Sequence, residues 1–163
     1  MNHHNLRIIP LGGLGEVGKN MLAVEYGEHI LVVDAGLMFP ENDMLGIDYI
    51  IPDFQYLLDK RQNVAGIIVT HGHEDHTGAL RHLLEQIHAP IYATPLTRGL
   101  VEVKLSRGGL LSQISLNTVE AGESVQLGPF KVEFFHVCHS IPDGVGLGIT
   151  TPAGLVVHTG DYK

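Results

Sequence analysis

Short apolar runs separated by glycines and polar residues predict strands at both ends of the chain. Before residue 70 these runs lie at residues 6–11, 21–26, 29–33 and 67–69. Runs of this length, bounded by turn residues such as Gly27, are typical of β-strands. Beyond residue 114, alternating apolar positions and turns predict strands over 115–120, 124–127, 129–137, 145–150 and 154–158.

Helical spacing is confined to the middle of the chain. Pro52 is expected to introduce a helix that runs to about residue 61, because proline is favoured in a first helical turn. Over residues 77–88, apolar side chains three and four positions apart predict a helix that packs on a sheet. The elements expected next are a strand over 89–93 and a helix over 95–107 that ends at Gly108 and Gly109. Since there is no repeat, linker or low-complexity segment, we expect one domain, or part of one, over residues 1–163.

The stretch at residues 70–76, Thr-His-Gly-His-Glu-Asp-His, follows an apolar strand and holds four candidate metal ligands. Because side chains alternate in an extended segment, His71 and His73 are expected to point the same way and to hold one cation together. Asp75 and His76 come after the chain turns and are expected to face a second cation nearby. Neutral imidazole and carboxylate suit Zn²⁺, with Mn²⁺ as the main alternative.

A third histidine is available where a later strand stops. The strand over 129–137 ends shortly before His139, and a loop containing proline follows. We expect His139 to join the first two histidines on one cation, since catalytic zinc sites commonly use three protein ligands and keep a fourth position open. His136 is the alternative, but it lies within the predicted strand.

Carboxylates follow two further strands. Asp161 ends the turn after the strand over 154–158, and its two oxygens can coordinate two cations about 3.5 to 4 Å apart. His158, at the end of that strand, is expected to pack or to support a ligand rather than bind a cation. Asp34 follows the strand over 29–33, where it either accepts a hydrogen bond from a ligand histidine or caps the loop.

A glycine motif near the N-terminus imitates a nucleotide-binding fingerprint. Gly13, Gly15 and Gly18 have the spacing G-x-G-x-x-G, and an aspartate follows the next strands. A dinucleotide site needs a helix after these glycines, to place its N-terminus against the pyrophosphate. Residues 21–26 instead predict a strand, so we expect a flexible loop whose backbone can approach a substrate.

Composition bounds the environment and the partners. The net charge is −8 with scattered Lys and Arg, which argues against a nucleic-acid surface within these residues, although metal-binding proteins are often acidic. The single Cys138 excludes an internal disulfide and is expected to be a small buried residue in a reducing compartment. Without a secretory signal or an apolar run near ~20 residues, we expect a soluble cytoplasmic protein with no membrane partner.

The spacing H-x-H-x-D-H resembles the signature of the metallo-β-lactamase fold. Several other stretches resemble bacterial ribonuclease J and occur in the order of that family. His-Ser-Ile-Pro-Asp at 139–143 and Met-Phe-Pro at 38–40 are more specific to it than the shared zinc motif. The stretches that carry the resemblance are residues 11–21, 34–40, 71–78, 128–130, 139–143 and 158–163.

The resemblance implies an α/β fold, the αββα sandwich of metallo-β-lactamases, and a zinc-dependent ribonuclease of RNA processing and decay. Such enzymes act as 5′-3′ exonucleases, and some members also cleave internally. Hydrolysis would use an activated hydroxide between two Zn²⁺ ions, with Mn²⁺ as the alternative. The ligands implied are His71, His73 and His139 for one zinc, Asp75 and His76 for the other, and Asp161 as the bridge.

Two further roles are implied within this chain. Asp75 is placed to orient the attacking water, so it is the candidate catalytic carboxylate. Its role as a ligand alone would also explain its presence. The oxygen-rich loop at residues 37–52 is a candidate site for a structural Ca²⁺ near Gly46 and Asp48, since family members can carry one there.

The chain stops just after Asp161, where the family continues. We therefore expect an N-terminal portion of the sandwich that lacks the RNA-gripping domain and a later histidine ligand, and that is inactive alone. An apolar face and a sheet edge are then expected to be uncovered. The full-length protein is expected to bind RNA and to form a homo-oligomer. The alternatives are a hydrolase of small esters or lactams and a metal-binding fragment without catalysis.

Overall fold

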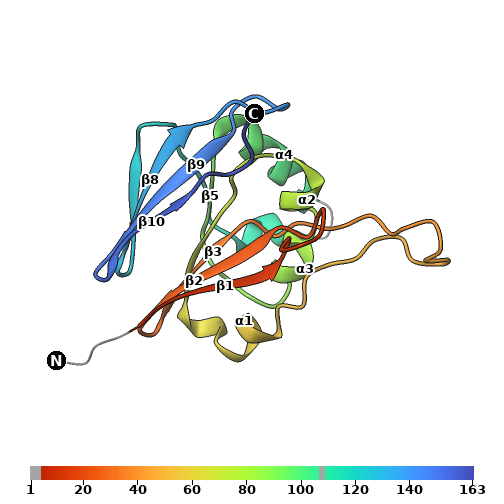
Figure 1. Cartoon of the computed structure of the whole chain (residues 1–163), viewed down its shortest axis with the longest axis horizontal. Coiled ribbons are helices and arrows are strands. Elements are labelled where there is room, and N and C mark those ends of the chain that lie inside the picture. The colour runs from red at the N-terminus through yellow and green to blue at the C-terminus, as the bar shows by residue number, and fades with distance from the viewer. Residues whose placement is uncertain (1–4, 107–108) are drawn as a thin grey trace.

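The computed structural model describes residues 5–106 and 109–163, which form two stacked β-sheets with helices on one side (Figure 1). The larger sheet has six strands in the order β1-β2-β3-β4-β5-β6, and the smaller has four in the order β10-β9-β8-β7. The mixed α/β layers confirm the expected fold class. The larger sheet contains β1 (Leu6–Gly12), β2 (Met21–Tyr26), β3 (His29–Val33), β4 (Val64–Ile68), β5 (Ile91–Ala93) and β6 (Leu116–Thr118). The smaller contains β7 (Ser124–Leu127), β8 (Phe130–His136), β9 (Val145–Thr151) and β10 (Gly154–His158).

The larger sheet changes from antiparallel to parallel pairing at β3. Strands β1, β2 and β3 form two antiparallel pairs, with Val24 opposite Leu31 and a turn at Gly27, whose φ of 61° suits glycine. Strands β3 to β6 are parallel, with Ile67 opposite Ile91. Parallel neighbours need crossover connections, which the helices provide. As a result, the loops that follow β3 and β4 leave the sheet at the same edge.

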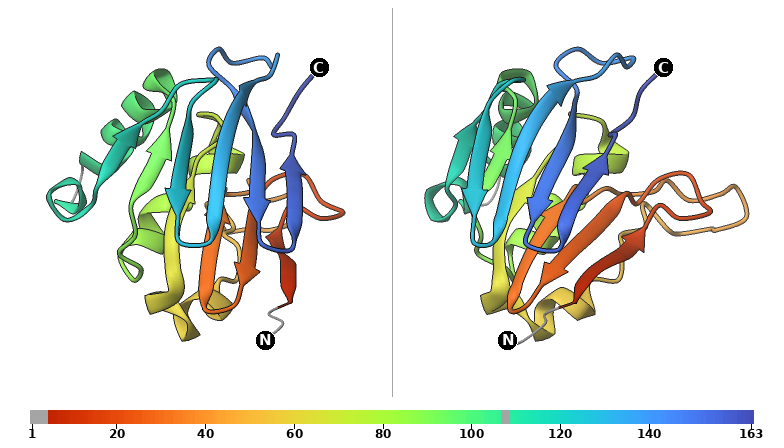
Figure 2. Two further views of the ribbon diagram at one scale, coloured as in Figure 1. Left: turned by 90° about the vertical axis from the view of Figure 1, so that its left-hand side faces the viewer. Right: turned by 60° about the vertical axis from the view of Figure 1, so that its left-hand side comes forward.

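The helices cover the outer face of the larger sheet (Figure 2). Apolar side chains on that face, such as Val32 and Ile67, are fully buried against helix residues such as Leu83. Burying each such side chain contributes roughly 1.5 to 3 kcal/mol to folding. The helices are α1 (Gln55–Asp59), α2 (Glu74–Thr77), α3 (Leu80–Leu84) and α4 (Pro95–Ser106), with 3-10 turns η1 (Arg61–Asn63) and η2 (Leu110–Gln113).

The single helix predicted over residues 77–88 is wrong. The structure has α2 and α3 in its place, and α2 begins inside the histidine motif. Gly78 leaves room for the loop after β3, because a Cβ there would lie 2.3 Å from Cγ of Leu37. The backbone N–H of Ala79 donates to the carbonyl of Ala35 at 2.8 Å. The loop after β3 therefore enters the gap between the two helices.

Two other helix boundaries also differ from the sequence prediction. The helix expected from Pro52 begins at Gln55, because the Asp53 carboxylate accepts the Gln55 N–H at 3.0 Å and forms the turn before it. It ends at Asp59 rather than near residue 61. The expected end of α4 at Arg107 and Gly108 lies outside the described residues.

The space between the sheets is filled by a second core. Along β8, Phe130, Val132 and Phe134 point inward and are buried, while the alternate residues are exposed. They pack against side chains from the inner face of the larger sheet, such as Val24 and Leu31. The two sheets are thereby held in a fixed relation, and so are the loops at their ends.

The outer face of the smaller sheet carries exposed apolar side chains, as expected. Phe135, Leu155 and Val157 are 39%, 62% and 58% exposed. Cys138 is exposed as well, so its prediction as a buried residue is wrong. It lies just beyond the end of β8, in a segment that has left the sheet. Within residues 5–106 and 109–163, we find no helix with the length and apolar character that a membrane span needs.

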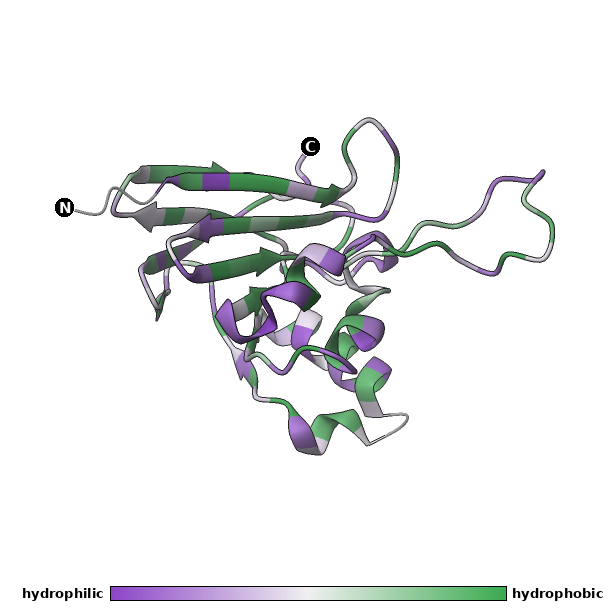
Figure 3. Ribbon diagram, turned by 90° about the horizontal axis from the view of Figure 1, so that it is seen from below, coloured by the Kyte–Doolittle hydropathy of each residue, from purple (hydrophilic) through white to green (hydrophobic). Residues whose placement is uncertain are grey.

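The segment between β3 and α1 extends from the body as a long arm (Figure 3). Met38 and Ile50 pair their backbones at its base, and residues 41–49 beyond them are exposed. Gly46 has a φ of 81°, which fits a turn near the tip. The arm starts beside the edge of the sheet where the histidine motif lies.

Candidate metal centre

Three segments that follow strands meet at one end of the sandwich. The loop after β4 carries His71, the loop after β8 carries His139, and the segment after β10 carries Asp161. The backbone N–H of Val145 donates to the carbonyl of Thr70 at 3.0 Å, which joins the start of β9 to the loop after β4. Residues that are far apart in the sequence are therefore brought to one place by strand ends.

Three imidazoles converge in the first part of this site. Nε2 of His71 lies 3.1 Å from Nδ1 of His73, and Nε2 of His139 lies 3.3 Å from the same Nδ1. The rings meet edge to face, with centroids 4.7 to 5.0 Å apart. The structure thus places His71 and His73 on one side, as expected from strand alternation, and brings His139 to them. His136, the alternative, is exposed at the end of β8.

A second group combines His71 with His76 and Asp161. Their ligand atoms all lie within 4.8 Å of one another. Oδ2 of Asp161 is 3.5 Å from Nε2 of His76 and 3.7 Å from Nε2 of His139. One carboxylate oxygen therefore reaches both groups. His71 also belongs to both groups, whereas the sequence suggested that it faces only the first cation.

Asp75 lies at the margin of the second group. It sits in the first turn of α2, and its Oδ2 is 3.7 Å from Nε2 of His76. Its side chain is 36% exposed, in contrast to His76, which is buried. The carboxylate can therefore meet both the solvent and the space in front of His76.

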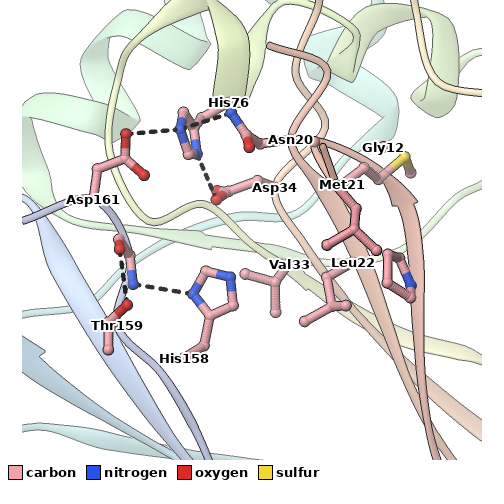
Figure 4. Close-up of a pocket in the computed structure, with 14 residues that line it drawn as sticks. Gly12, Asn20, Met21, Leu22, Val33, Asp34, His76, His158, Thr159 and Asp161 are labelled. Atoms are coloured by element: carbon pink, nitrogen blue, oxygen red, sulfur yellow. Dashed lines mark hydrogen bonds and ion pairs between the residues drawn. The ribbon is translucent and has the colours of Figure 1, made fainter. Parts of the chain in front are cut away.

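Asp34 fixes the orientation of His76 from behind. The carboxylate is buried, and its Oδ2 lies 2.8 Å from Nδ1 of His76 (Figure 4). Both carboxylate oxygens also accept hydrogen bonds from Thr70, one from the backbone N–H and one from the hydroxyl, each at 2.8 Å. The expected contact between Asp34 and a histidine of the site is confirmed. It directs Nε2 of His76 toward the other candidate ligands.

The buried charges shift the pKa values of two histidines in opposite directions. Desolvation acts to lower the pKa of His76, but Asp34, Asp161 and Asp75 together raise it to about 9. Burial lowers the pKa of His71 to about 4, with a further contribution from the charge of His76. Burial acts to raise the pKa of Asp34, but His76 outweighs it and holds that pKa below its usual value. At neutral pH His71 is therefore uncharged, with a nitrogen lone pair available to a cation.

The donor set fits a divalent cation. Imidazole nitrogens that converge to 3.1 and 3.3 Å compete for the same space, and a cation between them satisfies all their lone pairs at once. Nδ1 of His139 is buried and has no hydrogen-bond partner among the described residues. Nitrogen and carboxylate oxygen together suit Zn²⁺ or Mn²⁺. The residues present therefore fit the metal that the sequence suggested.

Sequence reasoning missed Asn20, whose side chain contacts both Asp75 and His76. Asn20 lies between the glycine loop and the strand that begins at Met21. Its place beside a loop expected to approach a substrate was the signal in the sequence that could have identified it. The loop does not introduce a helix, since β2 begins at Met21, and the dinucleotide interpretation is excluded. Its residues Gly12 and Gly13 line a pocket that also reaches His76 and Asp161 (Figure 4).

The remaining candidates belong to neither group. Gly46 and Asp48 are exposed on the arm, and the described residues form no cluster of three His, Cys, Asp or Glu ligands there. The Ca²⁺ site at these residues stays a prediction. His158 lines the pocket of Figure 4, and its Nδ1 accepts the N–H of Gly160 at 3.1 Å.

The sequence matches the family model described as the metallo-beta-lactamase superfamily over residues 14–162. It is 44% identical to ribonuclease J 1 of Streptococcus pyogenes over 96% of this chain and 28% of that protein. It is also 44% identical to ribonuclease J2 of Bacillus subtilis, over 99% of this chain and 29% of that protein. The identity to ribonuclease J of Helicobacter pylori is 44% as well, over 98% of this chain and 23% of that protein. The chain thus spans between 23% and 29% of the length of these three relatives.

Solved structures share the fold at lower identity. A protein of unknown function from Enterococcus faecalis superimposes with a TM-score of 0.75 and 19% identity, over 97% of this chain and 44% of that chain. The metallo-beta-lactamase fold protein YhfI from Bacillus subtilis gives a TM-score of 0.68 and 18% identity, over 97% of this chain and 64% of that chain. These likenesses support the sandwich fold described above.

Proposed function

Because the chain belongs to the metallo-beta-lactamase superfamily, we propose that its clustered histidines and aspartates hold two divalent cations and serve the hydrolysis of RNA phosphodiesters. Zn²⁺ is the proposed metal, with Mn²⁺ as the alternative, since the donors are imidazole and carboxylate. In this proposal His71, His73 and His139 hold the first cation, Asp75 and His76 hold the second, and Asp161 bridges them.

The position of Asp161 is the observation that carries the two-cation proposal. Its Oδ2 lies between the two groups, at 3.5 Å from Nε2 of His76 and 3.7 Å from Nε2 of His139. A carboxylate that reaches two sets of imidazoles is suited to bridge two cations about 3.5 to 4 Å apart. A site for a single cation would leave one of these groups without a charge to face.

The similarity to ribonuclease J proteins supports RNA as the substrate, since it extends over nearly the whole of this chain. The net charge of −8 gives these residues no evident surface for the RNA backbone. We therefore assign recognition of the scissile phosphate to this centre. Binding of the rest of the RNA is assigned to the regions of ribonuclease J proteins that this chain does not span.

Divalent cations in such a centre acidify water and neutralise charge on the phosphoryl oxygens. The chain keeps His71 neutral by burial, so that its lone pair is available. Asp34 holds Nδ1 of His76 and leaves Nε2 facing the site. Asp75 is partly exposed beside that nitrogen, and we assign it the role of orienting the attacking water and accepting its proton.

The experiment uses the product of the gene that encodes this sequence, loaded with Zn²⁺ and given 5′-labelled single-stranded RNA bearing a 5′-monophosphate. Release of mononucleotides indicates 5′-3′ exonuclease activity, and internal fragments indicate endonuclease activity. A thioester and a β-lactam serve as competing substrates. Turnover of either small substrate, with no cleavage of RNA, contradicts the proposal.

The role of Asp75 is tested separately with Asp75→Asn, compared with His88→Ala at an exposed position outside the centre. At full zinc content, we expect Asp75→Asn to lower the rate and to change the pH–rate profile, because a proton acceptor has been removed. The control should behave as the wild type. An unchanged profile in Asp75→Asn leaves Asp75 as a ligand only.

A further inference from the structure

Asn20 connects three segments that meet at the candidate metal centre. Its backbone N–H donates to the carbonyl of Asp75 at 3.0 Å, and its own carbonyl accepts the N–H of Gly36 at 3.0 Å. The glycine loop, the loop after β3 and helix α2 are therefore joined through this residue. These bonds use only the backbone, so they do not explain why the side chain is an asparagine.

The side-chain amide faces the candidate ligands directly. Nδ2 donates to the Asp75 carbonyl at 3.1 Å and to Oδ2 of the Asp75 carboxylate at 3.3 Å. The same Nδ2 lies 3.1 Å from Nε2 of His76 (Figure 4). Both Oδ2 of Asp75 and Nε2 of His76 belong to the proposed second cation site.

The local structure also fixes which way the amide points. The carbonyl of Asp75 can only accept, so the amide nitrogen is the atom turned toward it. The amide oxygen points to the glycine loop, where a Cβ on Gly13 would lie 2.5 Å from it. Gly13 has a φ of 82°, which also favours glycine. The Asp75 carbonyl thus fixes the orientation of the Asn20 amide, and Gly13 leaves room for the amide oxygen.

We propose that Asn20 is a positioning residue for the second cation, because its amide nitrogen holds the Asp75 carboxylate in line with Nε2 of His76. The Asp75 side chain is 36% exposed, and without this hydrogen bond it can rotate into solvent. Partners that orient a ligand in this way change metal affinity by roughly 10- to 100-fold when removed. The first cation site has no contact with Asn20 among the described hydrogen bonds.

The inference rests on the proposed two-cation centre and is tested by metal binding rather than by turnover. Zinc is titrated into the metal-free protein against a chromophoric chelator, and the absorption spectrum is recorded with Co²⁺ in place of zinc. For Asn20→Ala we expect the second cation to bind about 10- to 100-fold more weakly, with the first unchanged. The Co²⁺ bands of the second site should change and those of the first should remain.

Two further variants separate positioning from folding. Asn20→Ser keeps a short donor and should fall between Asn20→Ala and the wild type. Asn42→Ala, an exposed asparagine on the arm, should match the wild type. If Asn20→Ala does not fold, Asn20→Ser provides the same comparison of affinity and spectrum.

The outcomes distinguish the two proposals. A wild type that binds fewer than two cations contradicts the centre itself. If the wild type binds two and the folded Asn20 variants bind both with wild-type affinity and spectra, the centre stands and the role of Asn20 is overturned. Equal weakening of both cations also overturns it, because that result indicates a general structural effect.

Discussion

Two clusters of charged side chains lie at opposite ends of β2. They differ in whether Lys and Arg side chains of the chain balance their carboxylates. At the α1 end, Oε1 of Glu25 accepts from Arg7 at 3.0 Å, and Oε2 accepts from Tyr56 at 2.5 Å and from Lys60 at 2.7 Å. Every charge there faces a partner supplied by the chain. At the other end, the histidines and aspartates of the candidate centre face mainly one another.

The difference separates a structural cluster from a site. Around Glu25, the positive charges outweigh the desolvation of the carboxylate and hold its pKa below the usual value. In the centre, burial lowers the pKa of His71 while Asp34 and other carboxylates raise that of His76. No Lys or Arg side chain takes part in the described contacts of these two histidines. A cluster of imidazoles and carboxylates that has no Lys or Arg partner is suited to bind a divalent cation.

The largest effect is expected from His71→Ala, because His71 belongs to both groups of ligands. Loss of this ligand of the first cation, which also lies beside the second group, should weaken zinc binding and lower RNA hydrolysis by the complete gene product on the order of 10³-fold, equivalent to several kcal/mol of transition-state stabilisation. Zinc content and initial rates measure the effect, with His88→Ala as the control. Retention of both zinc ions by His71→Ala would contradict this assignment.

Gly36→Ala should disturb the frame of the centre without removing a ligand. A Cβ at Gly36 would lie 1.5 Å from the carbonyl oxygen of Asp75, so α2 must move. We expect a loss of about 3 kcal/mol or more in unfolding free energy, measured by urea denaturation, together with weaker zinc binding. Gly99→Ala is the matched control, since its added Cβ meets nothing within 4 Å and should be neutral or slightly stabilising.

The metal-free protein should lose stability as the pH rises from about 6.5 to 9. The folded-state pKa of His76 is raised to about 9 from an ordinary value of 6.5. The protonated His76 therefore contributes fully to folding stability below pH 6.5, and this contribution is lost as the pH rises through 9. The change should reach roughly 3 kcal/mol at most. Urea denaturation in a chelator at several pH values measures it. Asp34→Asn should flatten the slope, and an equal slope in that variant would exclude the Asp34–His76 pair as its cause.

Glu25→Gln should have the smallest effect and should not reach the centre. Lys60 and Arg7 are 34% and 53% exposed, so solvent screens their attraction to Glu25. We expect a loss of about 1 kcal/mol in unfolding free energy and no change in zinc content. If zinc binding fell as much as stability did, the two clusters would not be independent.

Local patterns predicted much of this molecule. The strand ranges 21–26 and 29–33 agree residue for residue with β2 and β3, because each is an apolar run between turns. His71 and His73 lie together, as strand alternation required. His139 and Asp161 were placed near them because both follow strand ends.

The remaining features depend on contacts between distant segments. The contacts of Asn20 join residues 55 and 56 positions apart, and no local pattern records them. At the break between α2 and α3, the backbone N–H of Ala79 donates to the carbonyl of the distant Ala35. His71 belongs to both groups of candidate ligands because Asp161, which follows a strand of the smaller sheet, lies beside it. Such features follow from how distant loops and strands pack in three dimensions, which the sequence pattern alone does not specify.

The central claim is that residues within this chain assemble a centre for two cations. Native mass spectrometry of the zinc-loaded chain, with Asp161→Ala alongside, tests it most directly. We expect two zinc ions on the wild type and fewer on Asp161→Ala, because its carboxylate lies between the two groups of histidines. One zinc ion or none on the wild type would contradict the claim.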